Sequence, residues 1–97
     1  MRVIPDPLFF DWDSGNSNKN FLKHGVSNQE AEEVFGNEPL IIAEDQKHSS
    51  SEIRYQALGQ TNTNRKLFLS FTIRNQKVRI ISIRDMNHKE EKTYDQN

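Results

Sequence analysis

Two β-rich runs, residues 66–74 and 77–84, constrain the fold more strongly than any other part of the sequence. They flank Asn75-Gln76, and two such runs separated by a pair of turn residues predict an antiparallel hairpin. A longer loop remains an alternative, because Gln is a poor residue for the second turn position. With the two-residue loop, the register pairs Arg74 with Lys77, Thr72 with Arg79 and Phe68 with Ile83.

This register sorts the hairpin side chains onto two faces, since neighbouring residues of a strand point to opposite sides. One face is apolar, and we expect helices to cover it. The other mixes basic, hydroxyl and apolar groups, as an open sheet surface that receives a nucleic-acid strand would. The apolar face comprises Leu67, Leu69, Phe71, Ile73, Val78 and Ile80, and the open face comprises Phe68, Ser70, Thr72, Arg74, Lys77, Arg79, Ile81 and Ile83.

Shorter signals predict the remaining elements. Capping boxes at Ser27-Asn28-Gln29-Glu30 and Asn87-His88-Lys89-Glu90 predict one helix over 28–35, ended by a left-handed Gly36, and a last helix after residue 87. A weaker helix signal over 14–24 ends at Gly25. Short strands are expected at 9–12, 40–43 and 53–58, the last closed by Gly59. The last helix is nearly all polar, so it has to lie on the surface or against a partner.

Length and composition narrow the class of protein. A chain of 97 residues is long enough for one core, so we predict a single domain over residues 1–97. The absence of cysteine excludes disulfides, thiolate metal sites and cysteine nucleophiles. No apolar run is long enough to cross a bilayer, and the first residues lack the apolar region of a secretory signal. We therefore expect no membrane partner and a cytoplasmic location.

Charge is unevenly distributed along the chain. The net charge of −1 argues against a general, non-specific nucleic-acid binder. Seven acids and one base lie between Asn28 and Glu52, whereas six bases and no acid lie between Arg65 and Arg84. This division predicts one face for a polyanion and another that stays in water or meets a basic partner. Chance clustering on a solvated surface is the alternative.

The histidines limit where acid–base chemistry can occur. A ribonuclease that uses no metal needs a base for the 2′-hydroxyl, a proton donor for the leaving oxygen and cations around the phosphate. His24, His48 and His88 are the only imidazoles. His48 lies in a polar loop and is the candidate acid or base, whereas His24 lies at a predicted helix C-terminus, where contact with the last carbonyls is favoured over catalysis. No histidine has metal-ligand spacing to another, so we expect neither a metal nor a cofactor.

Two arginines are candidates for stabilising phosphate charge. The hairpin register places Arg79 on the open face beside Thr72, where a merely solvated arginine is the alternative. Arg84 lies at the strand end, placed to meet a phosphate, to pair with Glu90 or Glu91, or both. The sequence has no glycine-rich phosphate loop, nucleophile elbow or dinucleotide fingerprint. No motif therefore supports a nucleotide-dependent or acyl-transfer enzyme.

Two elements in fixed order carry a resemblance to a known family. They are Lys23-His24-Gly25-Val26-Ser27 and Arg79-Ile80-Ile81-Ser82-Ile83-Arg84. From Phe9 onward the chain resembles BrnT toxins. The matching residues also include Phe10-Asp11-Trp12-Asp13, Asn20, Glu30-Ala31, Val34-Phe35, Asp45, His48, Glu52, Arg54, Gly59, Phe71-Thr72, Glu90 and Tyr94.

The resemblance implies a fold, an activity and a partner. The fold is α+β and similar to RelE ribonucleases, with two N-terminal helices packed on a mainly antiparallel sheet of about four strands and a C-terminal helix. The activity is RNA cleavage that halts translation. The partner is a BrnA-like antitoxin with a ribbon-helix-helix part, and the pair represses its own operon, so operator DNA is reached only through the antitoxin.

The leading hypothesis is therefore an endoribonuclease toxin without metal or cofactor. Its catalytic residues are Arg79, Arg84 and His48, its RNA-binding residues are Arg54, Arg74, Lys77 and Lys23, and its antitoxin contacts are Phe68, Ile81 and Ile83. A catalytically weak binding module, which acts with the antitoxin in operon repression, is the alternative. It is motivated by the net charge of −1 and by the turn Asp85-Met86-Asn87, where the family commonly has a small residue and then Thr. An orphan structural protein is the third hypothesis.

Overall fold

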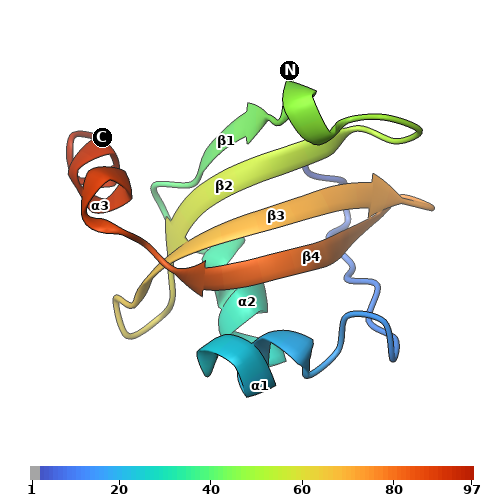
Figure 1. Ribbon diagram of the computed structural model, residues 1–97, viewed down its shortest axis with the longest axis horizontal. Coiled ribbons are helices and arrows are strands. Elements are labelled where there is room, and N and C mark those ends of the chain that lie inside the picture. Colours follow the sequence, from blue (N-terminus) through green and yellow to red (C-terminus); the bar gives the residue numbers. More distant parts are fainter. Residues whose placement is uncertain (1–2) are drawn as a thin grey trace.

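The computed structural model describes residues 3–97 and shows an α+β fold (Figure 1). Its helices are α1 (Lys19–His24), α2 (Asn28–Val34) and α3 (His88–Asp95), with a 3₁₀ turn η1 at Gln46–His48. Its strands are β1 (Ile41–Glu44), β2 (Arg54–Gln60), β3 (Lys66–Arg74) and β4 (Lys77–Asp85). The predicted fold class, with two helices before the sheet and one after it, is confirmed.

The four strands form one open antiparallel sheet in the order β1-β2-β3-β4. Figure 1 shows α1 and α2 together on one side of the sheet, whereas α3 stands apart from them near the end of β4. Among residues 3–97, the face opposite α1 and α2 is not covered by a helical layer, although α3 contacts β2 at one end of the sheet. We call this face the open face.

The hairpin between β3 and β4 has the predicted two-residue turn. Asn75 and Gln76 both adopt a positive φ, at 53° and 63°, which matches the right-handed twist of the flanking strands. Arg74 pairs with Lys77 and Thr72 with Arg79, as the sequence predicts. The longer loop is therefore excluded.

Further along the hairpin, a β-bulge shifts the register away from the predicted pairing. The ladder shifts between Ser70 and Phe71, so that Ser70 pairs with Ser82 and Phe71 with Ile80, leaving Ile81 as the extra residue. Phe68 therefore pairs with Arg84, and its predicted pairing with Ile83 is wrong. Because one extra residue reverses the alternation beyond it, Ile83 points into the core and is only 1% exposed. Ile83 is thus not part of the open face.

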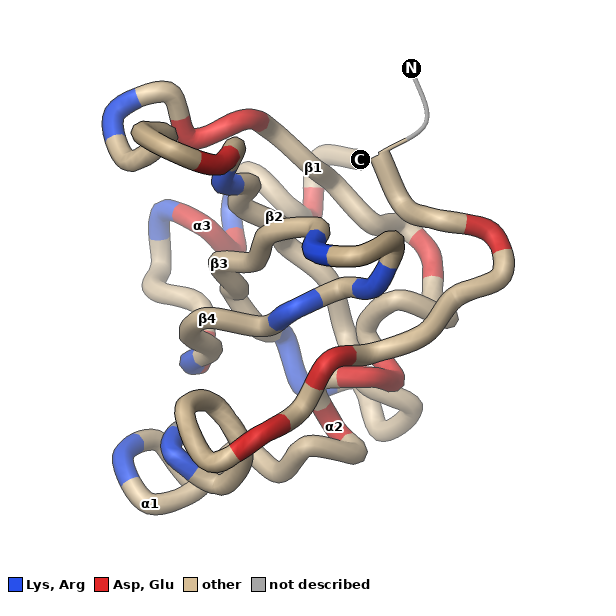
Figure 2. The backbone as a smooth tube through the Cα atoms, turned by 90° about the vertical axis from the view of Figure 1, so that its right-hand side faces the viewer, with Lys and Arg blue, Asp and Glu red and all other residues tan. Residues whose placement is uncertain are grey.

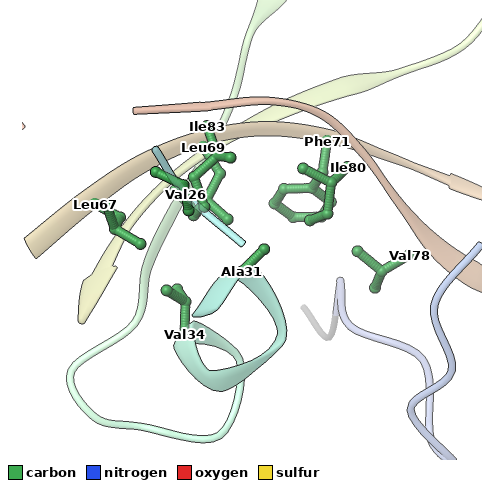
Figure 3. Packing of buried hydrophobic residues seen from close by; sticks show 10 residues of the cluster. Val26, Ala31, Val34, Leu67, Leu69, Phe71, Val78, Ile80 and Ile83 are labelled. Atoms are coloured by element: carbon green, nitrogen blue, oxygen red, sulfur yellow. The ribbon is translucent and has the colours of Figure 1, made fainter. Parts of the chain in front are cut away.

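The core lies between the sheet and α2. Ala31 and Val34 of α2 point toward the apolar face of the sheet, where Phe71 and Ile80 pack against them (Figure 3). Gly59 in β2 is required by this packing, since a Cβ at that position would clash with the Val34 side chain. The buried cluster comprises Val26, Ala31, Val34, Ala57, Leu67, Leu69, Phe71, Val78, Ile80 and Ile83, with Ile73 half-buried beside it.

Both predicted capping boxes are present. The Ser27 hydroxyl accepts a hydrogen bond from the Glu30 amide at 3.1 Å, and the Glu30 carboxylate accepts one from the Ser27 amide at 3.0 Å. Asn87 and Glu90 make the same reciprocal pair at the start of α3. The predicted polar helix thus lies on the surface, anchored through Tyr94, whose hydroxyl donates to the Pro39 carbonyl at 2.7 Å.

Several predicted boundaries are wrong for local reasons. The N-terminal segment forms no strand over 9–12 but a single parallel bridge from Phe10 to Val78. Helix α1 starts only at Lys19, after Asn18 with φ 64°, and Gly25 ends it with φ 67° as predicted. Gly36 is not left-handed, because α2 already ends at Val34 with a right-handed cap at Phe35. Strand β2 continues through Gly59 to Gln60 instead of stopping there.

Candidate functional site

Two adjoining hollows on the open face bring together several of the predicted site residues. The first, of 230 Å³, we call the histidine hollow; it is lined by Asp45, His48, Arg54, Gln56, Phe68, Ser70, Ile81 and Ser82. The second, of 210 Å³, we call the arginine hollow; it is lined by Gly15, Asn16, Lys19, Glu52, Arg54, Arg74, Arg79, Ile80 and Ile81. Arg54 and Ile81 belong to both, so a ligand can extend from one hollow into the other.

His48 is held by an aspartate at the edge of the histidine hollow. Its Nδ1 lies 2.8 Å from Asp45 Oδ2, and Asp45 also caps η1 by accepting from the His48 amide. Gln56 Nε2 donates to the same carboxylate oxygen at 3.2 Å. Desolvation acts against ionisation, but the bonds from His48 and Gln56 together hold the pKa of Asp45 below its usual value. This arrangement orients the ring and leaves Nε2 for a substrate, since the imidazole side chain is 58% exposed.

Arg79 is fixed from behind by the chain segment before α1. Its Nη1 and Nη2 donate to the two Asp13 carboxylate oxygens at 3.1 and 3.0 Å, and Asp11 lies 3.5 Å from Nη1. The hydrogen bonds from Arg79, and then from the Gly15 amide, lower the pKa of Asp13. The Arg79 side chain is only 14% exposed, which marks a positioned group and not a solvated arginine.

A buried asparagine holds that segment in place. Asn16 is 3% exposed, and its Nδ2 donates to the carbonyls of Asp11 and Ile80 at 2.9 and 3.0 Å. Its Oδ1 accepts from the Asp13 amide at 2.9 Å. Sequence reasoning missed Asn16 and Asp13 as supports of Arg79. The closely spaced Asp, Gly and Asn residues indicate a turn, but nothing in the sequence says which strand the turn meets.

Arg54 and Arg74 complete the cationic lining. Arg74 donates through Nε and Nη2 to the two oxygens of Glu52, and this pairing lowers the Glu52 pKa. Within residues 3–97, the Arg54 guanidinium has no ion-pair partner. Thr72, opposite Arg54 on β3, is buried, and its hydroxyl donates to the Ile53 carbonyl and not to a ligand in the hollows. Arg54 is therefore the cation with the most unused donors at the junction of the two hollows.

Arg84 lies outside both hollows but contacts one of their walls. Its guanidinium stacks on Phe68 with 4.3 Å to the ring centroid, while Nη1 and Nη2 donate to the Glu90 carboxylate at 2.8 and 3.0 Å. Of the two uses predicted for Arg84, pairing with Glu90 is confirmed. The arginine thus links α3 to the Phe68 wall of the histidine hollow.

Residues 12–90 match the family described as the ribonuclease toxin, BrnT, of type II toxin–antitoxin systems. The chain belongs to this family. The match includes His48, Arg54, Arg74, Arg79 and Arg84, so both hollows fall within the part that defines a BrnT ribonuclease toxin. Membership also gives the chain an RNA substrate and an antitoxin partner. A comparison with curated proteins found no match.

The BrnT site gathers some of the predicted RNA and antitoxin contacts but not all. Phe68 and Ile81 line the histidine hollow. Lys77 at the hairpin tip and Lys23 in α1 line neither hollow, although Lys19, one turn earlier in α1, lines the arginine hollow. Nothing in the sequence distinguishes Lys19 from Lys23, because their difference depends on how α1 is turned against β4.

The basic character of the hairpin is largely neutralised by acids from other segments. Figure 2 shows red positions of the chain before α1 running beside the blue positions of β4. Besides the three pairs already described, Arg65 pairs with Glu30 and Asp85, and Lys66 pairs with Asp95. The linear count of six uncompensated bases therefore overstates the charge of this face, since all of these acidic partners lie outside residues 65–84.

Residues 3–97 contain neither a metal-binding cluster nor a membrane-spanning helix. No group of three His, Asp or Glu side chains is close enough to hold a metal ion in this part of the chain. No helix there is both long and apolar enough to span a bilayer.

Proposed function

We propose that the chain is an endoribonuclease whose acid–base group is His48 and whose own arginines, not a metal ion, stabilise the phosphate. The observation that carries this proposal is the His48–Asp45 pair at 2.8 Å beside the unpaired Arg54. An imidazole oriented by a carboxylate, next to a cation with free donors, provides both acid–base catalysis and charge stabilisation.

The proposed reaction is an internal transesterification. The 2′-hydroxyl loses its proton, its oxygen forms a bond to phosphorus, and the bond from phosphorus to the 5′-oxygen breaks as that oxygen gains a proton. The products are a 2′,3′-cyclic phosphate and a 5′-hydroxyl. His48 acts in one of the two proton transfers, as base or as acid, and water completes the other. No metal is consumed or required in this balance.

The arginines have separate tasks in this proposal. Arg54 contacts the phosphate that is cut, because it borders both hollows and has unused donors. Arg79 adds charge from a position fixed by Asp13, so that little reorganisation is needed during the reaction. Arg84 supports the Phe68 wall, a surface on which a base can stack. Lys77 and Lys23, outside the hollows, attract RNA at longer range.

The test is cleavage of a labelled RNA by purified variants in EDTA. His48→Ala and Arg79→Ala should each lower the rate about a hundredfold or more. Lys92→Ala, which removes an exposed cation of α3, is the matched control and should cleave like the parent. Full activity of His48→Ala, or loss of parental activity in EDTA, would refute the proposal.

We propose further that the antitoxin is of the ribbon-helix-helix type and blocks the site by covering the open face, with operator DNA bound through the antitoxin alone. Phe68 and Ile81 are the apolar anchors, since exposed ion pairs contribute little. Ile83 is no anchor because it is buried. Phe68→Glu and Ile81→Glu should weaken antitoxin binding far more than Glu38→Ala, a change on an exposed turn. Equal affinities in a binding titration would defeat this idea.

A binding module with weak catalysis is the second candidate function. The observation that favours it is that Arg74, Arg79 and Arg84 are all occupied by carboxylates in the free chain. Purified chain that leaves RNA intact, yet shifts operator DNA when its antitoxin is added, would establish it. In either case we propose a single domain over residues 1–97 that works in the cytosol, where RNA and the antitoxin are found.

A further inference from the structure

We propose that the arginine hollow is a subsite for a second RNA phosphate, next to the phosphate that is cut. This inference rests on the proposed function, since it assigns the cut phosphate to Arg54 and the histidine hollow. The substrate class is thereby narrowed to RNA with a phosphate flanking the cleaved linkage.

The lining of the arginine hollow is that of an anion site. Four cationic side chains, Lys19, Arg54, Arg74 and Arg79, face a single lining carboxylate, Glu52. They come from α1, β2, β3 and β4, so the fold brings together cations that are up to 60 residues apart in the sequence. A phosphate group, which accepts several charge-assisted hydrogen bonds at once, fits this set of donors.

Two of these arginines are already oriented and still have donors to give. Arg79 uses one hydrogen on each of Nη1 and Nη2 for Asp13, and Asp11 lies 3.5 Å from Nη1, which leaves Nε and the second hydrogen of Nη2. Arg74 uses Nε and Nη2 for Glu52, which leaves Nη1. Because both side chains are held before any ligand arrives, binding loses less conformational entropy.

The position of the hollow fixes which phosphate it takes. It shares Arg54 and Ile81 with the histidine hollow, so the two sites adjoin along these side chains. A single RNA strand whose cut phosphate lies at Arg54 therefore carries its next phosphate into the arginine hollow. Glu52 competes there with the phosphate for Arg74.

The test measures kcat/KM of the full-length protein on three minimal RNA substrates. One is a mixture of dinucleoside monophosphates of all sequences, and the others carry an added phosphate at the 5′ end or at the 3′ end. One added phosphate should raise kcat/KM on the order of tenfold, the effect of a charge-assisted contact. The arm that gains identifies the direction in which RNA lies. No gain in either arm would overturn the proposal.

Variants show whether the gain arises in the arginine hollow. The readout is the ratio of kcat/KM with and without the added phosphate. Arg74→Ala should bring this ratio close to one, whereas Lys92→Ala, an equal loss of charge on α3, should keep the parental ratio. Glu52→Gln should raise the ratio, because a competing carboxylate is removed. An unchanged ratio in Arg74→Ala, or a lower one in Glu52→Gln, would contradict the assignment.

A binding measurement separates this proposal from the proposed function. Inorganic phosphate is titrated into the parent, and the amide chemical shifts of Lys19, Arg74 and Arg79 are followed. Saturable shifts at these residues that are lost in Arg74→Ala support the subsite even if no RNA is cut, a result that would refute only the nuclease assignment. Shifts spread evenly over exposed lysines, including Lys92, would refute the subsite while cleavage stood.

Discussion

Asp13 and Arg79 are 66 residues apart in the sequence, yet two hydrogen bonds of 3.1 and 3.0 Å join their side chains. This pair connects the irregular segment before α1 to the centre of the candidate site. Because the buried Asn16 accepts from the Asp13 amide and donates to the Ile80 carbonyl, the backbone that carries this carboxylate is fixed to β4.

Loss of Asp13 should impair catalysis without unfolding the protein. In Asp13→Ala the Arg79 guanidinium is free to turn, and misplacement of a phosphate-binding group costs about tenfold to a hundredfold in rate. The pair lies at the surface, so the midpoint of urea unfolding should hardly change. Glu38→Ala is the control for loss of one acid. Cleavage by Asp13→Ala that equals or exceeds the parental rate would show that the carboxylate screens Arg79 instead of positioning it.

The bulge predicts that alanine substitution lowers the free energy of unfolding much more at Ile83 than at Ile81. Ile83→Ala should lower the free energy of unfolding by about 2–5 kcal/mol, because it opens a cavity in the core. Ile81→Ala should cost about 1 kcal/mol or less, because that side chain is half-buried on the open face and can be partly replaced by water. Denaturant unfolding of the two variants checks this. Similar losses at both positions would contradict the observed register.

Glu90 should make stability depend on pH in the acid range. Its pKa is lowered from 4.5 by the hydrogen bonds from Arg84. A lowered pKa in the folded state means that the contribution is present above pH 4.5 and is lost as the pH falls through the folded-state value. Glu90→Gln removes the ion pair, whereas Gln can still complete the capping box.

The difference in free energy of unfolding between the parent and Glu90→Gln should therefore be greatest near neutral pH and shrink below pH 4.5. Its size should be about 1 kcal/mol or less, since the pair is partly exposed and screened. Unfolding curves recorded across this pH range measure it. A difference that is constant with pH would show that the ion pair does not stabilise the fold.

Tyr94 should anchor α3 through its hydroxyl as well as its ring. Tyr94→Phe keeps the ring and loses the bond to the Pro39 carbonyl, which should cost about 1 kcal/mol. Tyr94→Ala also loses the buried ring and should cost about 3–5 kcal/mol. Hydrogen exchange of the α3 amides should accelerate in the same order. Unaltered exchange in Tyr94→Ala would mean that α3 is held by its ion pairs alone.

Local patterns predicted the starts of α2 and α3 and the hairpin turn because the determining residues are close in sequence. Ser27 and Glu30 satisfy each other within one turn, and the Asn75-Gln76 pair is flanked directly by the strands it joins. The apolar face of β3 follows from plain alternation. These features needed no knowledge of the rest of the chain.

The candidate site was predicted only in part because its pairs span the whole chain. His48 and Arg79 were selected from the sequence, and they line adjoining hollows. The carboxylate that holds Arg79 comes from before the first helix, and the one that holds Arg74 comes from the loop before β2. Charge counted along the sequence does not reveal such partners. The bulge at Ile81 was also missed, because β-branched residues lie on both sides of it.

The extra residue Ile81 also determines on which side of the sheet Arg84 lies relative to Arg79. Arg79 and Arg84 are separated by an odd number of positions, so in an unbroken strand they would point in opposite directions. The insertion restores even parity, and both guanidinium groups reach the same surface. Deletion of Ile81 should therefore leave a regular ladder in which Arg79 and Arg84 are four positions apart and still share one surface, whereas a strand that kept Ile81 without the bulge would turn Arg84 toward the interior.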